Sequence, residues 1–393
     1  MVTNIGYKNT DIGVIPKDWD CIHLCTLGKL LSGLTYTPED VKNYGLLVLR
    51  SSNIQEGRLC FKDNVYVNCK IEADKYVKQG DLLICVRNGS RALIGKCALI
   101  DKNYNATFGA FMALFRSPHG KYLYQLFSNN TIQEQINRNC GATINQITSA
   151  DFNRFLVAFP QNPKEQAAIS EALSDVDNLT SSLQKLIEKK KAIKQGAMQE
   201  LLTGKKRLPG FSGEWSNLRI EEIANLHDNL RVPVEKSMRE KGNIPYYGAN
   251  GIQDYVNGYT HNGSYVLIAE DGANDLQEYP IRYASGKMWV NNHVHVLDGK
   301  NSVSDTRFLS YSMSTIDYQA AITGGTRAKL NGHILMQLAL DLPPLAEQQA
   351  IAQVLSDMDS EIEQLKKKLS KYQQIKQGMM QELLTGRIRI TNY

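Results

Sequence analysis

One long stretch occurs twice in this chain, and the repeat constrains the architecture more than any other feature. Residues 165–204 (EQAAISEALSDVDNLTSSLQKLIEKKKAIKQGAMQELLTG) align without a gap with residues 347–386 (EQQAIAQVLSDMDSEIEQLKKKLSKYQQIKQGMMQELLTG), at an offset of 182 residues. The identities gather at the two ends, as EQxAI, LSDxD and IKQGxMQELLTG. A long fixed period indicates that the chain is built from two copies of one scaffold.

Both copies have the apolar pattern of a coiled-coil helix. Apolar residues recur in alternating steps of four and three, which is the 3.5-residue period of a coiled-coil seam. In the second copy they are Ile351, Leu355, Met358, Ile362, Leu365, Leu369, Tyr372, Met379 and Leu383, with Lys376 at the skipped position. In the first copy they are Ile169, Leu173, Val176, Leu183, Ile187, Ala197 and Leu201, with an interruption at Lys190.

The ends of these helices and their partners can also be predicted. Pro163 and Pro344 lie just upstream, where proline can begin a helix, and Gly204 and Gly386 suit the C-terminal ends. At 1.5 Å per residue each helix would be about 50–60 Å long. Its apolar stripe is too narrow to remain unpaired in water. Each helix could pair with another chain, but we favour pairing of the two copies with each other.

The segments that flank the helices repeat more weakly. IPKDWDCIHLCTLGKL (15–30) resembles PGFSGEWSNLRIEEIANL (209–226), and both segments later contain a helix-like stretch, a Gly-Thr loop and a short strand before proline. The tail RIRITNY resembles the start of KKRLPGF, so joining the two termini would restore the repeat. A cyclic repeat predicts internal two-fold symmetry and antiparallel helices. The predicted segments are a first globular domain (1–161), a central helix (162–205), a second globular domain (206–343), a distal helix (344–386) and a C-terminal tail (387–393).

Composition places the chain among ordinary globular proteins of a reducing compartment. Hydrophobic residues make up 42% and charged residues 22%, no run of eighteen apolar residues occurs, and the N-terminus lacks the apolar core of a signal peptide. The cysteine count is seven, an odd number, and there is no CxxC pair, which argues against a disulfide framework or a zinc site. We therefore expect a cytoplasmic protein with no membrane partner. The net charge of +5 permits a polyanionic partner without requiring one.

Catalytic motifs give little support to an enzyme. GSRALIGKC (89–97) has the wrong glycine spacing for a phosphate-binding loop, and Cys97 stands where Ser or Thr is needed. His293 and His295 share one face of a probable strand, without an evident third metal ligand. We expect no catalytic residue, no bound metal and no bound cofactor in this chain.

Polar loops give better support to nucleic-acid binding. Arg and Lys suit guanine edges and phosphates, and Asn and Gln suit adenine edges. The candidate residues of the first half are Arg87, Asn88, Ser90, Arg91, Lys96, Asn145 and Gln146. Those of the second half are Tyr246, Tyr247, Asn250, Asn274, Asn291, Asn292, His293, Thr326, Arg327 and Lys329. Such loops are often merely solvated, so the pairing of the loops in both halves is the stronger indication.

Taken together, these motifs resemble the specificity subunit of type I restriction-modification enzymes. The resemblance rests on the two LSDxD and IKQGxMQELLTG copies, on LPPLAEQQAIAQVL (342–355) and on IGVIPKDW (12–19). It implies an α+β fold with two globular target recognition domains, separated by two long antiparallel coiled-coil helices with an internal pseudo-two-fold repeat. The first copy departs from the family by entering through FPQNPKEQ.

The resemblance also implies partners. A non-catalytic subunit of this family reads a bipartite double-stranded DNA site and binds two modification (methyltransferase) subunits and ATP-dependent restriction subunits. S-adenosylmethionine, ATP and Mg²⁺ would be used by those subunits. Repeated polar residues predict the docking sites: Gln195, Gln199, Glu200, Gln377, Gln381 and Glu382. A free-standing two-headed DNA-binding regulator, or an enzyme that acts alone on nucleic acid, remains an alternative.

Overall fold

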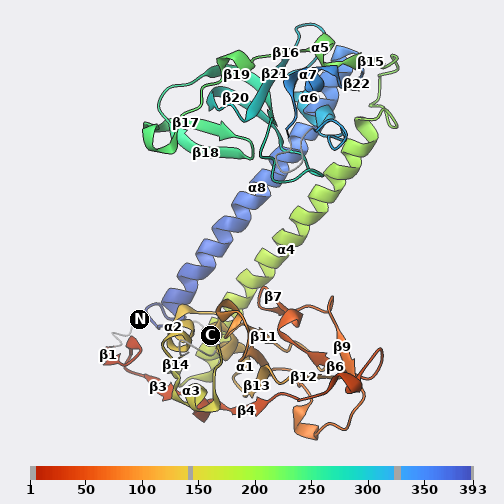
Figure 1. Ribbon diagram of the computed structural model, residues 1–393. Coiled ribbons are helices and arrows are strands. Elements are labelled where there is room, and N and C mark those ends of the chain that lie inside the picture. Colours follow the sequence, from red (N-terminus) through yellow and green to blue (C-terminus); the bar gives the residue numbers. More distant parts are fainter. Residues whose placement is uncertain (1–5, 140–144, 323–328, 391–393) are drawn as a thin grey trace. The chain divides into compact units, whose positions relative to one another are not determined.

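The computed structural model describes residues 6–139, 145–322 and 329–390, and its ribbon is drawn in Figure 1. Contacts divide the chain into two compact units. Unit 1 comprises Met1–Leu183 and Lys368–Tyr393, and unit 2 comprises Gln184–Lys367. Each unit therefore combines one globular domain with half of each long helix. Among the described residues, no helix is both long and apolar enough to cross a bilayer.

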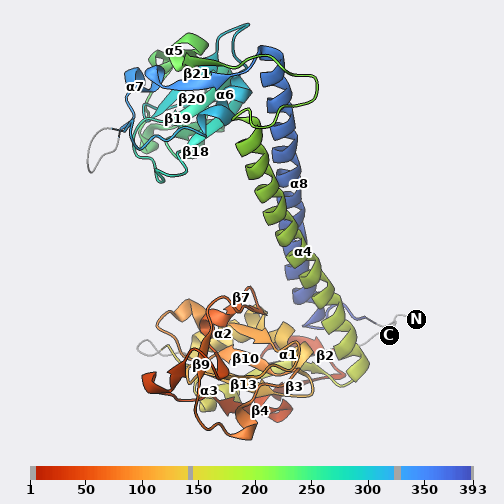
Figure 2. The ribbon, with the colours of Figure 1, turned by 90° about the vertical axis from the view of Figure 1, so that its right-hand side faces the viewer.

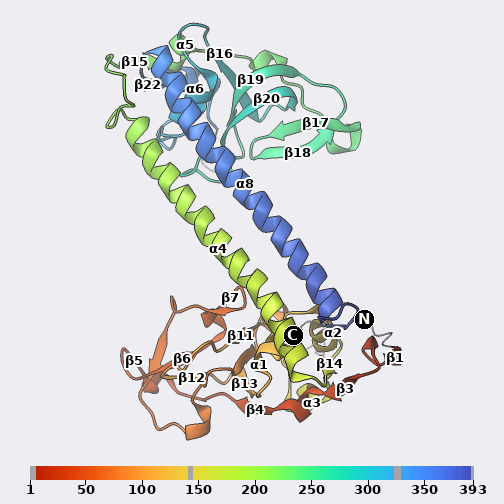
Figure 3. The ribbon, with the colours of Figure 1, turned by 180° about the vertical axis from the view of Figure 1, so that it is seen from behind.

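The repeated stretches form the two longest helices, as the apolar pattern predicts. Helix α4 spans Pro163–Leu201 and helix α8 spans Leu345–Leu383. In unit 2, Lys190 contacts Glu361 and Lys194 contacts Asp359, so the residue numbers rise along α4 as they fall along α8. The helix halves thus run antiparallel. The ribbons of α4 and α8 lie next to each other in both opposite views (Figures 1 and 3). The α+β fold with long antiparallel helices is confirmed.

Charged pairs occupy the interruptions of the apolar seam. Lys376 lies 2.6 Å from Asp177 in unit 1, and Lys194 lies 2.6 Å from Asp359 in unit 2. The two pairs are related by the offset of 182 residues. The counterpart of Lys376 is therefore Lys194, whereas the interruption that the apolar pattern places at Lys190 is a separate ion pair with Glu361. Lys376 and Lys194 can each replace an apolar seam residue, because an aspartate of the facing helix neutralises the ammonium group.

Removing one partner of such a pair has a predictable cost. We expect Asp177→Ala to lower the free energy of unfolding of unit 1 by about 1–2 kcal/mol, between the values typical of exposed and buried pairs. Lys376 would then remain half-buried without its counter-ion. The double variant Asp177→Ala/Lys376→Met should recover most of the loss, because methionine fits an apolar seam. Urea unfolding of the single and double variants measures this, and an equal loss in both would contradict it.

Unit 1 surrounds its main core with small sheets and short helices. The strands are β1 (Tyr7–Thr10), β2 (Gly13–Pro16), β3 (Trp19–His23), β4 (Lys29–Ser32), β5 (Val41–Lys42), β6 (Leu46–Leu49), β7 (Ile54–Gln55), β8 (Arg58–Leu59), β9 (Val65–Val67), β10 (Leu82–Cys85), β11 (Cys97–Leu99), β12 (Ala106–Phe108), β13 (Met112–Arg116) and β14 (Leu156–Pro160). The short helices are α1 (Gly120–Phe127), α2 (Asn130–Asn139) and α3 (Ser149–Arg154). One four-stranded sheet has the order β11-β10-β13-β4, and another has the order β12-β6-β9-β5.

Unit 2 is built around a single larger sheet. Its strand order is β16-β21-β19-β20-β17-β18, and β15 pairs separately with β22. The strands are β15 (Ser216–Arg219), β16 (Ala224–Leu226), β17 (Lys241–Gly248), β18 (Gly251–Val256), β19 (His261–Ala269), β20 (Ile281–Val290), β21 (Val294–Gly299) and β22 (Ala339–Leu342). The helices are α5 (Ile220–Ile223), α6 (Thr306–Met313) and α7 (Gly332–Gln337). Figure 2 shows α6 between this sheet and α8.

Both units contain the same clasp where a long helix enters the domain. In unit 2, Arg207 makes two 2.5 Å bonds to buried Glu347, and its guanidinium lies 5.7 Å from the Trp215 ring. In unit 1, Arg389 makes the same double contact with Glu165 and lies 5.6 Å from the Trp19 ring. The C-terminal tail thus supplies unit 1 with the arginine that follows α4 in unit 2. The C-terminus thus completes the N-terminal unit, as the cyclic repeat in the sequence predicts.

Candidate nucleic-acid interface

The structure brings together the two predicted loops of unit 1. The residues after β10 form an isolated antiparallel bridge between Arg87 and Gln146. The Asn88 N–H donates to the Asn145 carbonyl at 3.3 Å, and the Asn145 side chain donates to the Gly89 carbonyl at 3.0 Å. Four of the predicted residues therefore lie on two adjacent chain segments, one from each loop.

The other candidates of unit 1 have structural partners around the same turn. Ser90 is exposed, and its N–H donates to the Asn88 side chain at 3.0 Å. Arg91 is exposed, and its guanidinium donates to the Asn137 carbonyl at 2.9 Å. Lys96 is half-buried, with its ammonium 3.5 Å from the Ser51 carbonyl. Arg87 and Arg91 are thus the exposed arginines of this turn, and Arg87 is itself a member of the paired segments.

Unit 2 places its own loop beside the end of β19. Lys329 and Asp271 form an isolated antiparallel bridge, and the Lys329 ammonium lies 2.8 Å from the Glu270 carboxylate. Burial acts to raise the pKa of Glu270, but hydrogen bonds from Lys329 and Arg231 outweigh it and hold this pKa below its usual value. Thr326 and Arg327 lie outside the described residues.

The histidine pattern HxH links this loop to a buried ionic network. His295 is buried, with Nδ1 2.6 Å from the Asp228 carboxylate and Nε2 2.7 Å from the Leu330 carbonyl. Ligand atoms of Asp228, Glu270 and His295 lie within 4.8 Å of one another, as metal ligands would. However, the Arg231 guanidinium lies 2.6 Å from Glu270 and 3.2 Å from Asp228. The network already contains its cation, so these residues do not fit a metal ion.

Metal addition tests this interpretation of the cluster. We expect Mn²⁺, which suits carboxylate ligands better than thiols, to leave the unfolding temperature of the chain unchanged. A bound ion would have to displace the Arg231 guanidinium from both carboxylates. Thermal melts with Mn²⁺ and with a chelator provide the measurement. A stabilisation by Mn²⁺ that disappears in Glu270→Gln would contradict the assignment.

The asparagines predicted in unit 2 occupy two environments. Asn250 is exposed in the β17–β18 turn, donates to the Gly272 carbonyl at 2.9 Å and accepts from the Asn274 N–H at 3.0 Å. Asn291 is buried, and its side-chain oxygen accepts from the His293 N–H at 2.9 Å. The structure therefore joins Asn250 to Asn274 at the surface and uses Asn291 to shape the turn before β21.

The remaining candidates of unit 2 are spread over the same end of the sheet. Asn292 is exposed, and its carbonyl lies 3.4 Å from the Arg231 guanidinium. Tyr246 is buried, with its hydroxyl against Val234. Tyr247 is half-buried, and burial raises its pKa. Tyr246 thus belongs to the core, and Asn292 belongs to the exposed turn.

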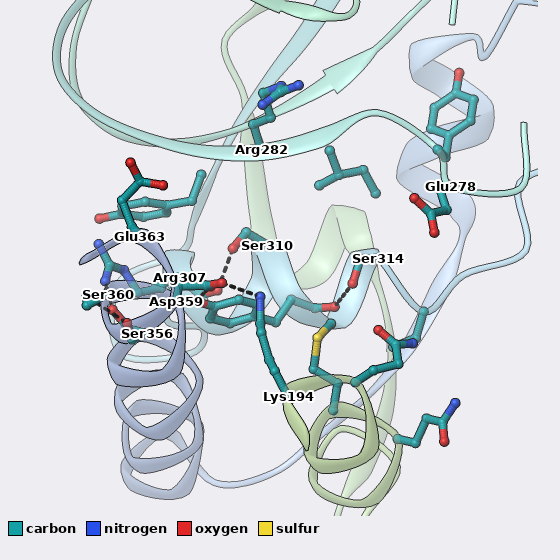
Figure 4. A pocket seen from close by; sticks show the side chains of 18 of the residues that line it. Lys194, Glu278, Arg282, Arg307, Ser310, Ser314, Ser356, Asp359, Ser360 and Glu363 are labelled. Carbon is teal, nitrogen blue, oxygen red and sulfur yellow. Dashed lines mark hydrogen bonds and ion pairs between the residues drawn. The ribbon is translucent and has the colours of Figure 1, made fainter. Parts of the chain in front are cut away.

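Unit 2 also contains a groove of about 1340 Å³ between its helix halves and the sheet (Figure 4). Lys194, Arg282 and Arg307 line it together with Asp359 and Glu363. Asp359 accepts from Lys194 at 2.6 Å and lies near the centre of the view in Figure 4. Sequence patterns did not identify these residues as candidates. The repeated LSDxD motif carries the one available signal, because its last aspartate is Asp359 in this copy.

The predicted docking residues lie on polar surfaces of the helix ends. Gln195, Gln199 and Glu200 are exposed on α4, and the first two line the groove. On α8, Gln377 and Gln381 are exposed and Glu382 is half-buried. The Thr203 hydroxyl donates to the Gln199 carbonyl, and the Thr385 hydroxyl donates to the Gln381 carbonyl. The two helix ends therefore share the same hydrogen bond from a threonine hydroxyl to a glutamine carbonyl.

Comparison with known proteins decides the family. The protein-family model described as type I restriction modification DNA specificity domain matches residues 16–195 and 212–376. The chain belongs to this family. Its two matched stretches correspond to the two repeats, so each unit contains most of one family domain together with part of a long helix.

Individual relatives agree with this assignment. A putative type I restriction enzyme specificity subunit from Haemophilus influenzae is 48% identical over 38% of this chain and 38% of its own length. The putative MjaX specificity subunit from Methanocaldococcus jannaschii is 25% identical over 98% of this chain and 97% of its own length. The EcoKI specificity subunit from Escherichia coli is 29% identical over 58% of this chain and 53% of its own length. The chain thus matches about two fifths of the first relative and nearly all of the second.

Solved structures show the same fold. The S subunit of a type I restriction-modification system from M. genitalium superposes with a TM-score of 0.69 at 18% identity, over 98% of this chain and 97% of that chain. This solved structure shows the shared fold. The family match and the curated relatives, which are all named specificity subunits, favour DNA sequence specificity over the free-standing regulator that the sequence alone leaves open.

Proposed function

We propose that this chain is the DNA specificity subunit of a type I restriction-modification complex. Each unit reads one half of a bipartite double-stranded DNA site. The observation that carries the proposal is the paired loop of each unit, which has the same backbone arrangement but different side chains. Arg87 and Gln146 form the bridge in unit 1, and Asp271 and Lys329 form it in unit 2. A repeated scaffold with divergent loop chemistry suits the reading of two different half-sites.

The proposal extends to partners. Two modification subunits, which use S-adenosylmethionine, dock on the two helix ends, and restriction subunits that use ATP and Mg²⁺ join the assembly in the cytoplasm. The chain itself contributes recognition and no catalysis. The equivalent ends around Gln199 and Gln381 support two equivalent docking sites. Native mass spectrometry of the saturated complex tests this, and a single bound methyltransferase would contradict it.

The first test of the function is the independence of the half-sites. We expect Arg87→Ala/Arg91→Ala to weaken or relax recognition of one half-site and Lys329→Ala to affect the other. Each lost base-edge contact costs about 1–3 kcal/mol, whereas a lost phosphate contact weakens all sequences alike. Methylated-site sequencing identifies the target, and competition binding with either half-site scrambled then measures the effect. Degradation of the same half-site by both variants would overturn the two-reader model.

A further inference from the structure

The two units place a pair of side chains at the same position of their scaffold. In unit 1, the Val86 N–H donates to the Phe111 carbonyl at 3.1 Å, and the Val86 carbonyl accepts from the Ile147 N–H at 2.8 Å. The next residue along the chain is Arg87, which forms the bridge with Gln146. Three segments thus converge at this point: the end of β10, the start of β13 and the loop before α3.

Unit 2 repeats these bonds residue for residue. The Glu270 N–H donates to the His293 carbonyl at 2.9 Å, and the Glu270 carbonyl accepts from the Leu330 N–H at 2.7 Å. Asp271 then forms the bridge with Lys329. The end of β19, the start of β21 and the loop before α7 therefore occupy the places of the three segments of unit 1.

The equivalent backbones carry different side-chain pairs. In unit 1 the Arg87 guanidinium lies 5.4 Å from the centre of the Phe111 ring. In unit 2 the Asp271 carboxylate lies 2.5 Å from Nδ1 of His293. Each pair joins the second residue after the first strand to the residue just before the second strand. Main-chain atoms alone make the shared bonds, so these side chains can differ without altering the scaffold.

Exposure separates these side chains from the core. The Phe111 ring is 58% exposed, although it is large and apolar. The side chains of His293 and Asp271 are 48% and 36% exposed. An exposed phenyl ring beneath a guanidinium contributes little to folding. It holds the cation in a fixed orientation and presents an apolar edge beside it.

We infer that these equivalent positions are the base-reading positions of the two units, with Phe111 and Asp271 as specificity-determining residues. The inference rests on the proposed DNA recognition. Arg87 reads a guanine edge, and Phe111 contacts the C5-methyl group of a neighbouring thymine. Asp271, oriented by His293, accepts a hydrogen bond from the amino group of a cytosine. The two half-sites therefore differ in chemistry at the same structural position.

Base analogues that lack a single functional group test this assignment. The full chain is assembled with its modification subunits, and the target is identified by methylated-site sequencing. Each thymine of the first half-site is then replaced in turn by uracil, which lacks only the methyl group. We expect one such replacement to weaken binding by the wild-type complex severalfold. Phe111→Ala should bind the unmodified site roughly as weakly and should show no further loss with that uracil.

The second unit has a matching test. Each cytosine of the second half-site is replaced in turn by 2-pyrimidinone, which lacks the amino group. We expect one replacement to weaken binding by the wild type and to have no effect on Asp271→Ala. The same Asp271→Ala complex should keep the full uracil penalty in the first half-site. Tyr44→Ala removes another exposed ring of unit 1 and serves as the control that keeps the wild-type penalties.

The possible failures are distinguishable. If the wild-type complex binds all DNA sequences equally, the proposed function itself is wrong. If it is sequence-specific but Phe111→Ala and Asp271→Ala retain every analogue penalty, the base-reading assignment is overturned. Loss of the uracil penalty in Tyr44→Ala would overturn it as well, because the effect would then not be confined to the Arg87–Phe111 pair.

Discussion

Replacing Arg389 by alanine is expected to lower the free energy of unfolding of unit 1 by about 3 kcal/mol, the lower end of the cost of breaking a buried ion pair. The Glu165 side chain is only 2% exposed and receives two bonds from this guanidinium. Asp18 accepts two more, at 2.9 and 3.0 Å. Without Arg389, the Glu165 carboxylate would remain buried, and among the described residues the Trp19 indole N–H, 3.3 Å away, would be the side-chain donor left to it.

The cost is expected to be local. Burial acts to lower the pKa of Arg389, but hydrogen bonds with Glu165 and Asp18 outweigh it and raise this pKa, so the guanidinium stays charged at any ordinary pH. Hydrogen exchange should therefore show faster opening of β3 and the start of α4 in the variant. The matched variant is Arg207→Ala, which removes the equivalent clasp on Glu347 and should weaken unit 2 instead. Equal exchange in the wild type and in Arg389→Ala would show that the tail does not hold unit 1.

His295→Ala is expected to lower the free energy of unfolding of unit 2 by about 2–3 kcal/mol, because it removes a buried imidazole that bonds both the Asp228 carboxylate and the buried Leu330 carbonyl. The ring is 1% exposed and joins the Asp228 carboxylate to the Leu330 carbonyl. Its removal would break the contact between the start of β21 and the Leu330 carbonyl, next to Lys329. We therefore also expect weaker recognition of the second half-site.

Two comparisons make this prediction specific. Urea unfolding measures the stability of unit 2, and competition binding measures each half-site separately. His293→Ala is the control for stability, since that side chain is 48% exposed and should cost less than about 1 kcal/mol. A His295→Ala variant that unfolds like the wild type and keeps both half-sites would contradict the role of this histidine.

The repeat made the framework predictable from the sequence. The apolar seam is visible as a periodicity within each helix. The antiparallel order and the cyclic relation of the termini follow from the duplication of one segment. Ile169, Leu173, Ile351 and Leu355 are buried, as the seam requires. The pattern also located a polar interruption at Lys376, which the structure explains by Asp177 on the facing helix.

The candidate site was predictable only in part. Pairing of the Gly-Thr loops in the two halves correctly indicated which segments to compare, and the structure joins Arg87 to Gln146. Composition could not distinguish buried Asn291 from exposed Asn292, because adjacent residues of one turn can face opposite sides. Nor could it indicate Phe111, which precedes a strand of otherwise buried residues and looks like part of the core.

The sequence by itself determined that two copies of one scaffold are linked by two long helices, because periodicity and duplication are visible along a single chain. Only the tertiary structure decided which charges meet. Arg389 reaches Glu165 and Asp18, and Lys194 reaches Asp359, across long sequence separations. A charged side chain alone does not specify its partner. The partner is set by the elements that the core brings together, and the same packing places Arg87 over Phe111 and His293 beside Asp271.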